Sequence, residues 1–193
     1  MPLILFEDDG PEAGPIVEEP LPDRSFLAAY DEIAGAYTDS FVAEIDGDVS
    51  LADFISAFMT TPLFRLERLA LRLLGGHRPS DSDVRALADG RRDRLALWRV
   101  EERGQTQLLL EVMGKPLRSW FMVAPGEAGR TRRWFGSALL PVTGRAGGEK
   151  RLPLLSNSLI GPHRLYARLL LGAAARRLGG AKAGRSAAIT VVK

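Results

Sequence analysis

Cysteine is absent from this chain of 193 residues, and histidine occurs only twice, as His77 and His163. Without thiols the chain can form no disulfide, no zinc or iron–sulfur site held by cysteines, and no cysteine nucleophile. Two histidines so far apart in the sequence show no metal-ligand spacing. We therefore predict that the protein holds no metal and no cofactor.

Long hydrophobic runs are missing as well. A membrane-spanning helix needs about 20 mostly apolar residues, whereas the apolar run in the last helical region extends only from Leu169 to Ala175 and has an arginine at each end. The short apolar start of the chain has no basic region before it and is followed by the acidic residues 7–9. That is not the pattern of a secretory signal. We expect no membrane span and a cytoplasmic location.

Opposite charges are unevenly distributed along the chain, although the formal net charge is only +2. Residues 1–49 contain 13 acidic and 1 basic side chains, whereas residues 145–193 contain 10 basic and 1 acidic. This separation predicts that the acidic N-terminal segment covers basic surface of the same chain. The arginines are spread over all predicted elements and form no nucleic-acid-binding motif, so we expect no nucleic-acid partner.

Composition divides the chain into one domain and two tails. Residues 1–24 contain five of the twelve prolines and few apolar residues. Such a segment buries too little surface to offset its ordering entropy, and it is predicted to be a disordered acidic tail. Residues 25–178 have the length and the patterning of a single domain. Residues 179–193 are small and basic, and we predict a flexible tail there.

Within the domain, the hydrophobic pattern changes from strand-like to helical, back to strand-like and finally to helical again. A first strand at 37–45 precedes three helices that begin at the caps Ser50, Thr61 and Ser80. Short turns then separate four strand-like runs, which indicates antiparallel hairpins: 94–102, 107–113, 117–123 and 131–142. A long helix at 162–178 completes the domain.

This order of elements predicts an α+β fold of the helix-grip type. In that arrangement a curved antiparallel sheet has short helices after its first strand and a long C-terminal helix packed across it. A cavity lies between the sheet and the long helix. Mainly apolar walls with a few polar groups would suit a small apolar or amphipathic ligand.

Six segments carry a resemblance to a known family. They are Tyr37–Phe41, Ser50–Leu74, Ala96–Glu101, Leu117–Val123, Trp134–Ala138 and Gly161–Tyr166. Through them the body of the chain resembles the bacterial family catalogued as domain of unknown function 2867. The resemblance implies a START-like, Bet v 1-like helix-grip domain. Relatives are fused to short-chain dehydrogenase domains, which also implies a role as a partner subunit. The family supplies no catalytic residues.

Arginines and tryptophans on the predicted strands are the first candidates for ligand contacts. Arg99, Arg118 and Arg132 point either to solvent or into the cavity, where a guanidinium would bind a carboxylate or phosphate. A second set of three lies on the same strands and either walls the cavity or fills the core: Trp98, Trp120 and Trp134. For both sets the two alternatives remain open.

Three further residues carry hydroxyl or imidazole groups that a ligand or a reaction could use. Ser137 lies within a strand rather than in the strand–turn–helix of a nucleophile elbow, so it is a candidate hydrogen-bonding group for a ligand. His163, which follows the predicted helix start at Pro162, and Tyr166 are candidates for acid–base chemistry.

Three functions are compatible with these observations. The first is a binding domain for a small, largely apolar ligand, and the order of elements together with the three tryptophans favours it. The second is a cyclase- or hydrolase-like enzyme on the same fold. The third is a non-catalytic partner subunit of a short-chain dehydrogenase-like protein.

Overall fold

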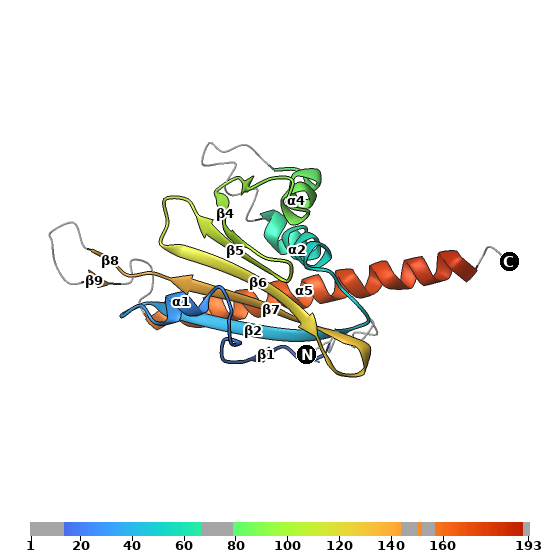
Figure 1. The fold of residues 1–193 in the computed structure, drawn as a ribbon, viewed down its shortest axis with the longest axis horizontal. Coiled ribbons are helices and arrows are strands. Elements are labelled where there is room, and N and C mark those ends of the chain that lie inside the picture. The colour runs from blue at the N-terminus through green and yellow to red at the C-terminus, as the bar shows by residue number, and fades with distance from the viewer. Residues whose placement is uncertain (1–13, 67–78, 144–149, 152–156, 191–193) are drawn as a thin grey trace, which may run out of the picture.

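The computed structural model describes residues 14–66, 79–143, 150–151 and 157–190. These residues form an α+β architecture in which a curled antiparallel sheet has seven strands, in the order β1-β2-β7-β6-β5-β4-β3 (Figure 1). The strands are β1 Val17–Glu18, β2 Tyr37–Asp46, β3 Arg94–Leu95, β4 Trp98–Arg103, β5 Gln107–Val112, β6 Leu117–Pro125 and β7 Arg130–Leu139. The predicted α+β class is confirmed.

The helices and a small second sheet complete the described elements. The helices are α1 Ala28–Asp31, α2 Leu51–Met59, α4 Asp81–Ala88 and α5 Asn157–Thr190. Residues 62–66 are also helical, and a short 3-10 turn spans Glu127–Gly129. A separate two-stranded sheet pairs β8 Val142–Thr143 with β9 Lys150–Arg151. No helix within the described ranges is long and apolar enough to cross a membrane.

Consecutive strands β4 to β7 pair as antiparallel neighbours, which is the meander that the short turns predict. The first long strand, β2, then pairs with the last, β7, over ten residues, from Tyr37 opposite Leu139 to Asp46 opposite Arg130. This pairing places β2 side by side with β7 although about 90 residues separate them in the sequence. Side chains of both strands therefore meet on each face of the sheet.

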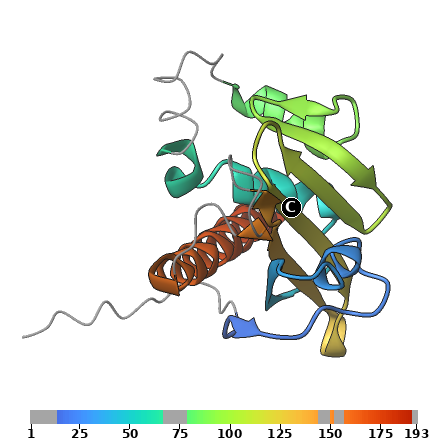
Figure 2. The same cartoon turned by 90° about the vertical axis from the view of Figure 1, so that its left-hand side faces the viewer.

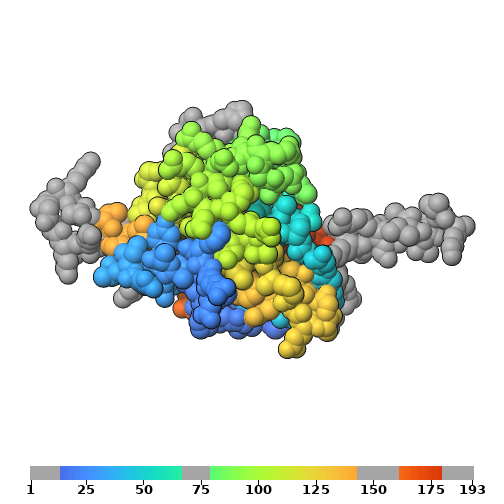
Figure 3. Space-filling view, in the orientation of Figure 1, coloured from blue at the N-terminus to red at the C-terminus, as the bar shows by residue number. Residues whose placement is uncertain are grey.

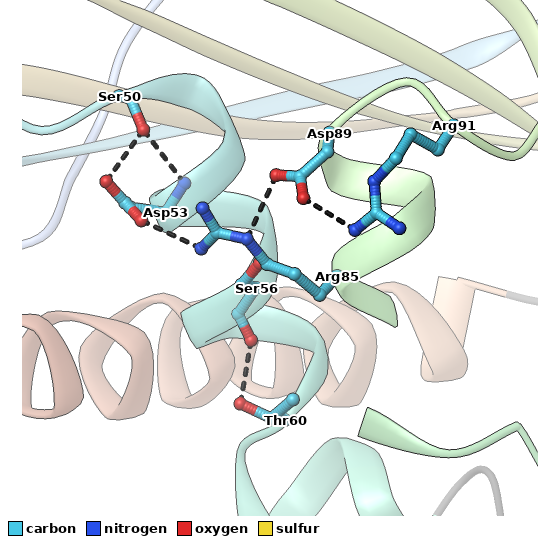
Figure 4. Close-up of polar contacts among 7 residues, drawn as sticks. All are labelled: Ser50, Asp53, Ser56, Thr60, Arg85, Asp89 and Arg91. Carbon is cyan, nitrogen blue, oxygen red and sulfur yellow. Dashed lines mark hydrogen bonds and ion pairs between the residues drawn. The ribbon is translucent and has the colours of Figure 1, made fainter. Parts of the chain in front are cut away.

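Capping residues fix where α2 and α4 begin, as the sequence predicts. The Ser50 hydroxyl accepts a hydrogen bond from the Asp53 backbone N–H at 3.1 Å, and Ser80 forms a full capping box with Asp83. Figure 4 shows that the Arg85 side chain of α4 also reaches Asp53, with the guanidinium 2.9 Å from the carboxylate. The start of α2 is therefore held both by its cap and by an ion pair to α4.

The last helix, α5, is longer than the predicted 162–178. It begins at Asn157, passes through Pro162 and the glycine pair at 179–180, and ends at Thr190. Glycine and proline lower helix propensity, which is why the pattern alone indicates a shorter helix. Contacts with β2, α2 and β7 outweigh this local preference over the part of α5 that packs on the sheet.

The two faces of the sheet are covered by different parts of the chain (Figure 2). We call the face toward α2 and α5 the inner face, and its core includes Phe41, Phe121 and Phe135. The opposite, outer face carries a smaller core around Trp120 and Trp134. Leu21, Phe26, Leu27 and Tyr30 of the N-terminal segment pack on this core, and the surface of that segment is seen in blue in Figure 3.

Residues 14–24, the second part of the predicted disordered tail, run along the edge of β2. Val17 of β1 pairs with Val42, and the backbone N–H of Glu19 donates to the carbonyl of Ser40 at 3.1 Å. The Glu19 carboxylate also lies 2.7 Å from the Arg132 guanidinium. Composition indicated disorder because it does not reveal these strand and ion-pair contacts. Residues 1–13 lie outside the described residues.

Candidate functional site

A pocket of about 170 Å³ lies between the inner face of the sheet, α2 and α5. Its walls are mainly apolar and include five aromatic side chains, Phe58, Phe64, Trp98, Phe121 and Phe135. These rings pack on one another, with centroid separations of 4.5 Å for Phe58 and Phe135 and 5.1 Å for Phe64 and Trp98. Most of the pocket surface therefore offers contact to an apolar ring.

Polar side chains gather at one end of the pocket. Ser119 on β6 and Ser137 on β7 lie directly opposite each other in the sheet, and α5 contributes His163 and Tyr166. Directly opposite residues of an antiparallel pair project from the same face, which places both hydroxyl groups on the inner face. The pocket thus combines aromatic walls with a small set of hydrogen-bonding groups.

Asp39 orients the histidine at this polar end. The Asp39 side chain, only 1% exposed, accepts a hydrogen bond from the Ser137 backbone N–H at 2.9 Å and lies 3.2 Å from Nε2 of His163. The Tyr37 hydroxyl is a third donor, at 3.3 Å. Burial and the neighbouring Asp39 carboxylate raise the pKa of Tyr37, so this hydroxyl keeps its proton at neutral pH.

The contact between Asp39 and His163 defines what the imidazole can do chemically. With Nε2–H donated to the carboxylate, Nδ1 is the nitrogen that can accept a proton or a hydrogen bond. A histidine held in this way by a buried carboxylate has the arrangement of a general base. Asp39 is not among the residues selected from the sequence, although it shares one face of β2 with Tyr37 and Phe41.

Arg133 is the second inner-face residue that sequence analysis missed. It lies opposite Ala43 on β2 and Val123 on β6 and is 0% exposed. Its guanidinium carbon is 5.7 Å from the centroid of the Phe54 ring, and desolvation by burial lowers its pKa to about 10. The sequence did contain a sign of this position. Side chains alternate along a strand, so Arg133 lies on the same face as Phe135 and Ser137, and Arg132 lies on the other face.

The three arginines selected from the sequence all lie on the outer face, away from the pocket. Each is engaged by an acidic side chain of that face: Arg99 by Glu111, Arg118 by Glu101 and Arg132 by Glu19. Arg118 also donates to the Tyr30 hydroxyl at 3.2 Å. The sequence left open whether these guanidinium groups point to solvent or into the cavity. In the structure they lie outside the space between sheet and helix.

The three tryptophans divide between the two faces. Trp98 is buried on the inner face and lines the pocket. Trp120 and Trp134 belong to the outer-face core, where the Trp120 indole N–H donates to Gln107 at 2.9 Å and the Trp134 ring lies beneath Arg132. Four candidates from the sequence therefore meet at the pocket: Trp98, Ser137, His163 and Tyr166.

Comparison with other proteins adds no assignment to this geometry. No protein-family model, no curated protein and no solved structure matches the chain. The resemblance to domain of unknown function 2867 thus remains a prediction. In the described part of the chain, no group of three or more His, Asp or Glu side chains could hold a metal ion. His77 is outside that part.

Proposed function

We propose that this protein binds a small, largely apolar ligand in the pocket between the sheet and α5, on a fold of the helix-grip type. The observation that carries the proposal is the composition of the pocket, with aromatic walls and a few convergent polar groups. Ligand sites in proteins have this character. The order of first strand, helices, meander and long last helix across the inner face supports the helix-grip assignment.

The volume of the pocket limits the ligand. At about 170 Å³ it is close to the cavity of about 150 Å³ that accommodates benzene, and below the roughly 300–1,000 Å³ of sites for drug-sized ligands. The occupant is therefore a single ring with one polar substituent rather than a lipid or an isoprenoid. The ring lies among the aromatic walls, and the substituent reaches the serine hydroxyls or His163.

Titration calorimetry with phenylacetamide, a ring with one neutral polar substituent, tests this proposal. Ala167 is fully buried and lines the pocket, so Ala167→Phe should fill it and weaken binding by about tenfold or more. Leu169 lies two residues further along α5 and is 52% exposed. Leu169→Phe is therefore the matched control and should bind like the wild type.

Two results would count against ligand binding in the pocket. One is the absence of any heat of binding in the wild type, and the other is equal binding by the wild type and Ala167→Phe. Thermal unfolding of each variant is recorded alongside, so that lost binding is not confused with a lost fold. If Ala167→Phe does not unfold cooperatively, Ser137→Ala replaces it, with weaker phenylacetamide binding expected because a hydroxyl partner is removed.

A second function is favoured by one specific contact, that between Asp39 and His163 at the edge of the pocket. A carboxylate-oriented imidazole beside an aromatic pocket could act as the general base of a hydrolase-like enzyme. With 4-nitrophenyl acetate as the test substrate, His163→Gln and Asp39→Asn should both lower the hydrolysis rate to the background. Unchanged hydrolysis in His163→Gln would argue against it. The role of dehydrogenase partner stays a prediction of the resemblance alone.

A further inference from the structure

The inner face holds a charged group that has no hydrogen-bond partner in the described structure. Arg133 on β7 is fully buried, and its Nε and both terminal nitrogens are without a hydrogen-bond partner. Its pKa of about 10 leaves the guanidinium charged at neutral pH. A buried charge that is neither paired nor hydrogen-bonded is strongly unfavourable. An anion bound to these nitrogens would remove the penalty.

Arg133 lies beside the proposed ligand pocket. Phe135, two residues further along the same face of β7, lines that pocket. Phe58 and Phe121 line it too, and both rings contact the ring of Phe54, with centroid separations of 6.1 and 5.8 Å. The guanidinium lies over that same Phe54 ring. Neither Arg133 nor Phe54 lines the pocket itself, so a ligand in the pocket reaches the guanidinium only if the intervening phenylalanine rings change rotamer.

Asp39, a second charged group on the inner face, makes the two ends of the pocket electrostatically different. Asp39 belongs to the polar end with His163, and it lies four residues along β2 from Ala43, the residue opposite Arg133. At about 3.3 Å per residue, the two positions are roughly 13 Å apart along the sheet. An anionic substituent is repelled at the Asp39 end and attracted at the Arg133 end.

We propose that Arg133 binds the carboxylate of a small organic acid whose ring occupies the pocket. The planar guanidinium can hold a carboxylate through two parallel hydrogen bonds. Unlike Arg99, Arg118 and Arg132, it is not already engaged by a protein carboxylate in the described structure. The inference rests on the proposed function, because it assigns a ligand class to the same pocket.

The test compares phenylacetate with phenylacetamide by calorimetric titration of the full chain at pH 7 and low chloride. The two ligands share their ring and shape and differ in charge. The wild type should bind the acid at least about tenfold more tightly, since charge-assisted hydrogen bonds are the stronger ones. Arg133→Met should lose this preference and keep phenylacetamide binding. Arg132→Met, the neighbouring arginine on the outer face, should keep both.

The outcomes separate this inference from the proposed function. Binding of both ligands with equal affinity by the wild type, or an undiminished preference in Arg133→Met, overturns the role of Arg133 and leaves the pocket as a ligand site. Binding of neither ligand overturns both proposals. If Arg133→Met does not unfold cooperatively, Arg133→Lys replaces it and should weaken only the acid. Equal loss of both ligands would then mark Arg133 as structural and overturn the inference.

Discussion

Two ionisable side chains on the inner face, Asp39 and Arg133, differ in how their burial is compensated. The Asp39 carboxylate accepts from the Ser137 N–H and the Tyr37 hydroxyl and also contacts the imidazole of His163. Within the described residues, the guanidinium of Arg133 has no hydrogen-bond partner and lies over the ring of Phe54. Burial of Asp39 is therefore compensated within the chain, whereas burial of Arg133 lowers the stability of the ligand-free protein.

Replacing Arg133 by methionine should therefore stabilise the ligand-free protein. Methionine has a similar length and no charge, and buried ionic groups replaced by apolar ones often give gains of about 1–4 kcal/mol. We expect urea unfolding of Arg133→Met to yield a higher free energy of unfolding by about that amount. Arg132→Met, which removes a half-exposed ion pair, should change it by about 1 kcal/mol or less. A destabilised Arg133→Met variant would contradict the account.

The difference in unfolding free energy between Arg133→Met and the wild type should depend on pH, in a direction that the pKa of Arg133 determines. The folded-state pKa of Arg133, about 10, lies below that of the unfolded chain. The penalty is therefore fully present well below pH 10 and decreases progressively as the pH rises above that value, because the folded state then releases a proton that the unfolded state still binds. The stability difference between Arg133→Met and the wild type should shrink between pH 9 and 11. A difference that widens over this range would contradict the assignment.

At the scale of elements, local signals in the sequence proved reliable where they act within one element. Ser50 and Ser80 fix the starts of α2 and α4, and the turns after β4, β5 and β6 produce the predicted meander. Features that depend on contacts with residues distant in the sequence could not be predicted from local patterns. The pairing of Val17–Glu18 with β2 rests on a tertiary contact, and the extension of α5 beyond 162–178 runs against local helix propensity.

The residues of the candidate site also divide into those that could be selected from the sequence and those that could not. His163 and Ser137 could be selected by residue type, because imidazole and hydroxyl groups carry chemistry. Asp39 and Arg133 could be selected only by knowing which strand face turns toward α5, and alternation along a strand does not say which face is covered. The same ambiguity placed Arg132, rather than its neighbour Arg133, among the ligand candidates.

Ser50, the N-cap of α2, and Ser56, within α2, should respond differently to replacement by alanine. Ser50→Ala removes the hydroxyl that caps the helix and should lower the free energy of unfolding by about 0.5–2 kcal/mol. Ser56, on the same helix (Figure 4), has a buried hydroxyl with no hydrogen-bond partner in the described structure. Ser56→Ala should therefore be neutral or stabilising. Chemical denaturation of both variants checks this, and equal losses would contradict the assigned cap.

At the scale of the whole molecule, acidic residues of the N-terminal segment form ion pairs with basic residues of the body. Glu18 pairs with Arg164 of α5, and Glu19 with Arg132 of β7. These pairs join the acidic beginning of the described chain to its basic strands and last helix. They are partly exposed, so they influence surface behaviour more than stability.

Two double variants of equal net charge test whether the N-terminal carboxylates cover basic surface of the body. Glu18→Gln with Glu19→Gln removes the carboxylates that pair with Arg164 and Arg132. Glu32→Gln with Glu127→Gln removes two exposed carboxylates with the same change in net charge. The first should be retained more strongly on a cation-exchange column, because freed guanidinium groups bind the matrix directly. Equal retention of the two proteins would show that the N-terminal carboxylates do not mask basic surface.

NMR shows directly whether a ligand enters the pocket between the sheet and α5. Phenylacetamide is titrated into the ¹⁵N-labelled wild type, and changes in amide chemical shift are mapped onto the structure. The largest changes should occur at Ser119, Ser137 and Ala167, which line the pocket on β6, β7 and α5. Changes confined to outer-face residues such as Arg118 and Arg132, or no changes at millimolar ligand, would contradict binding in this pocket.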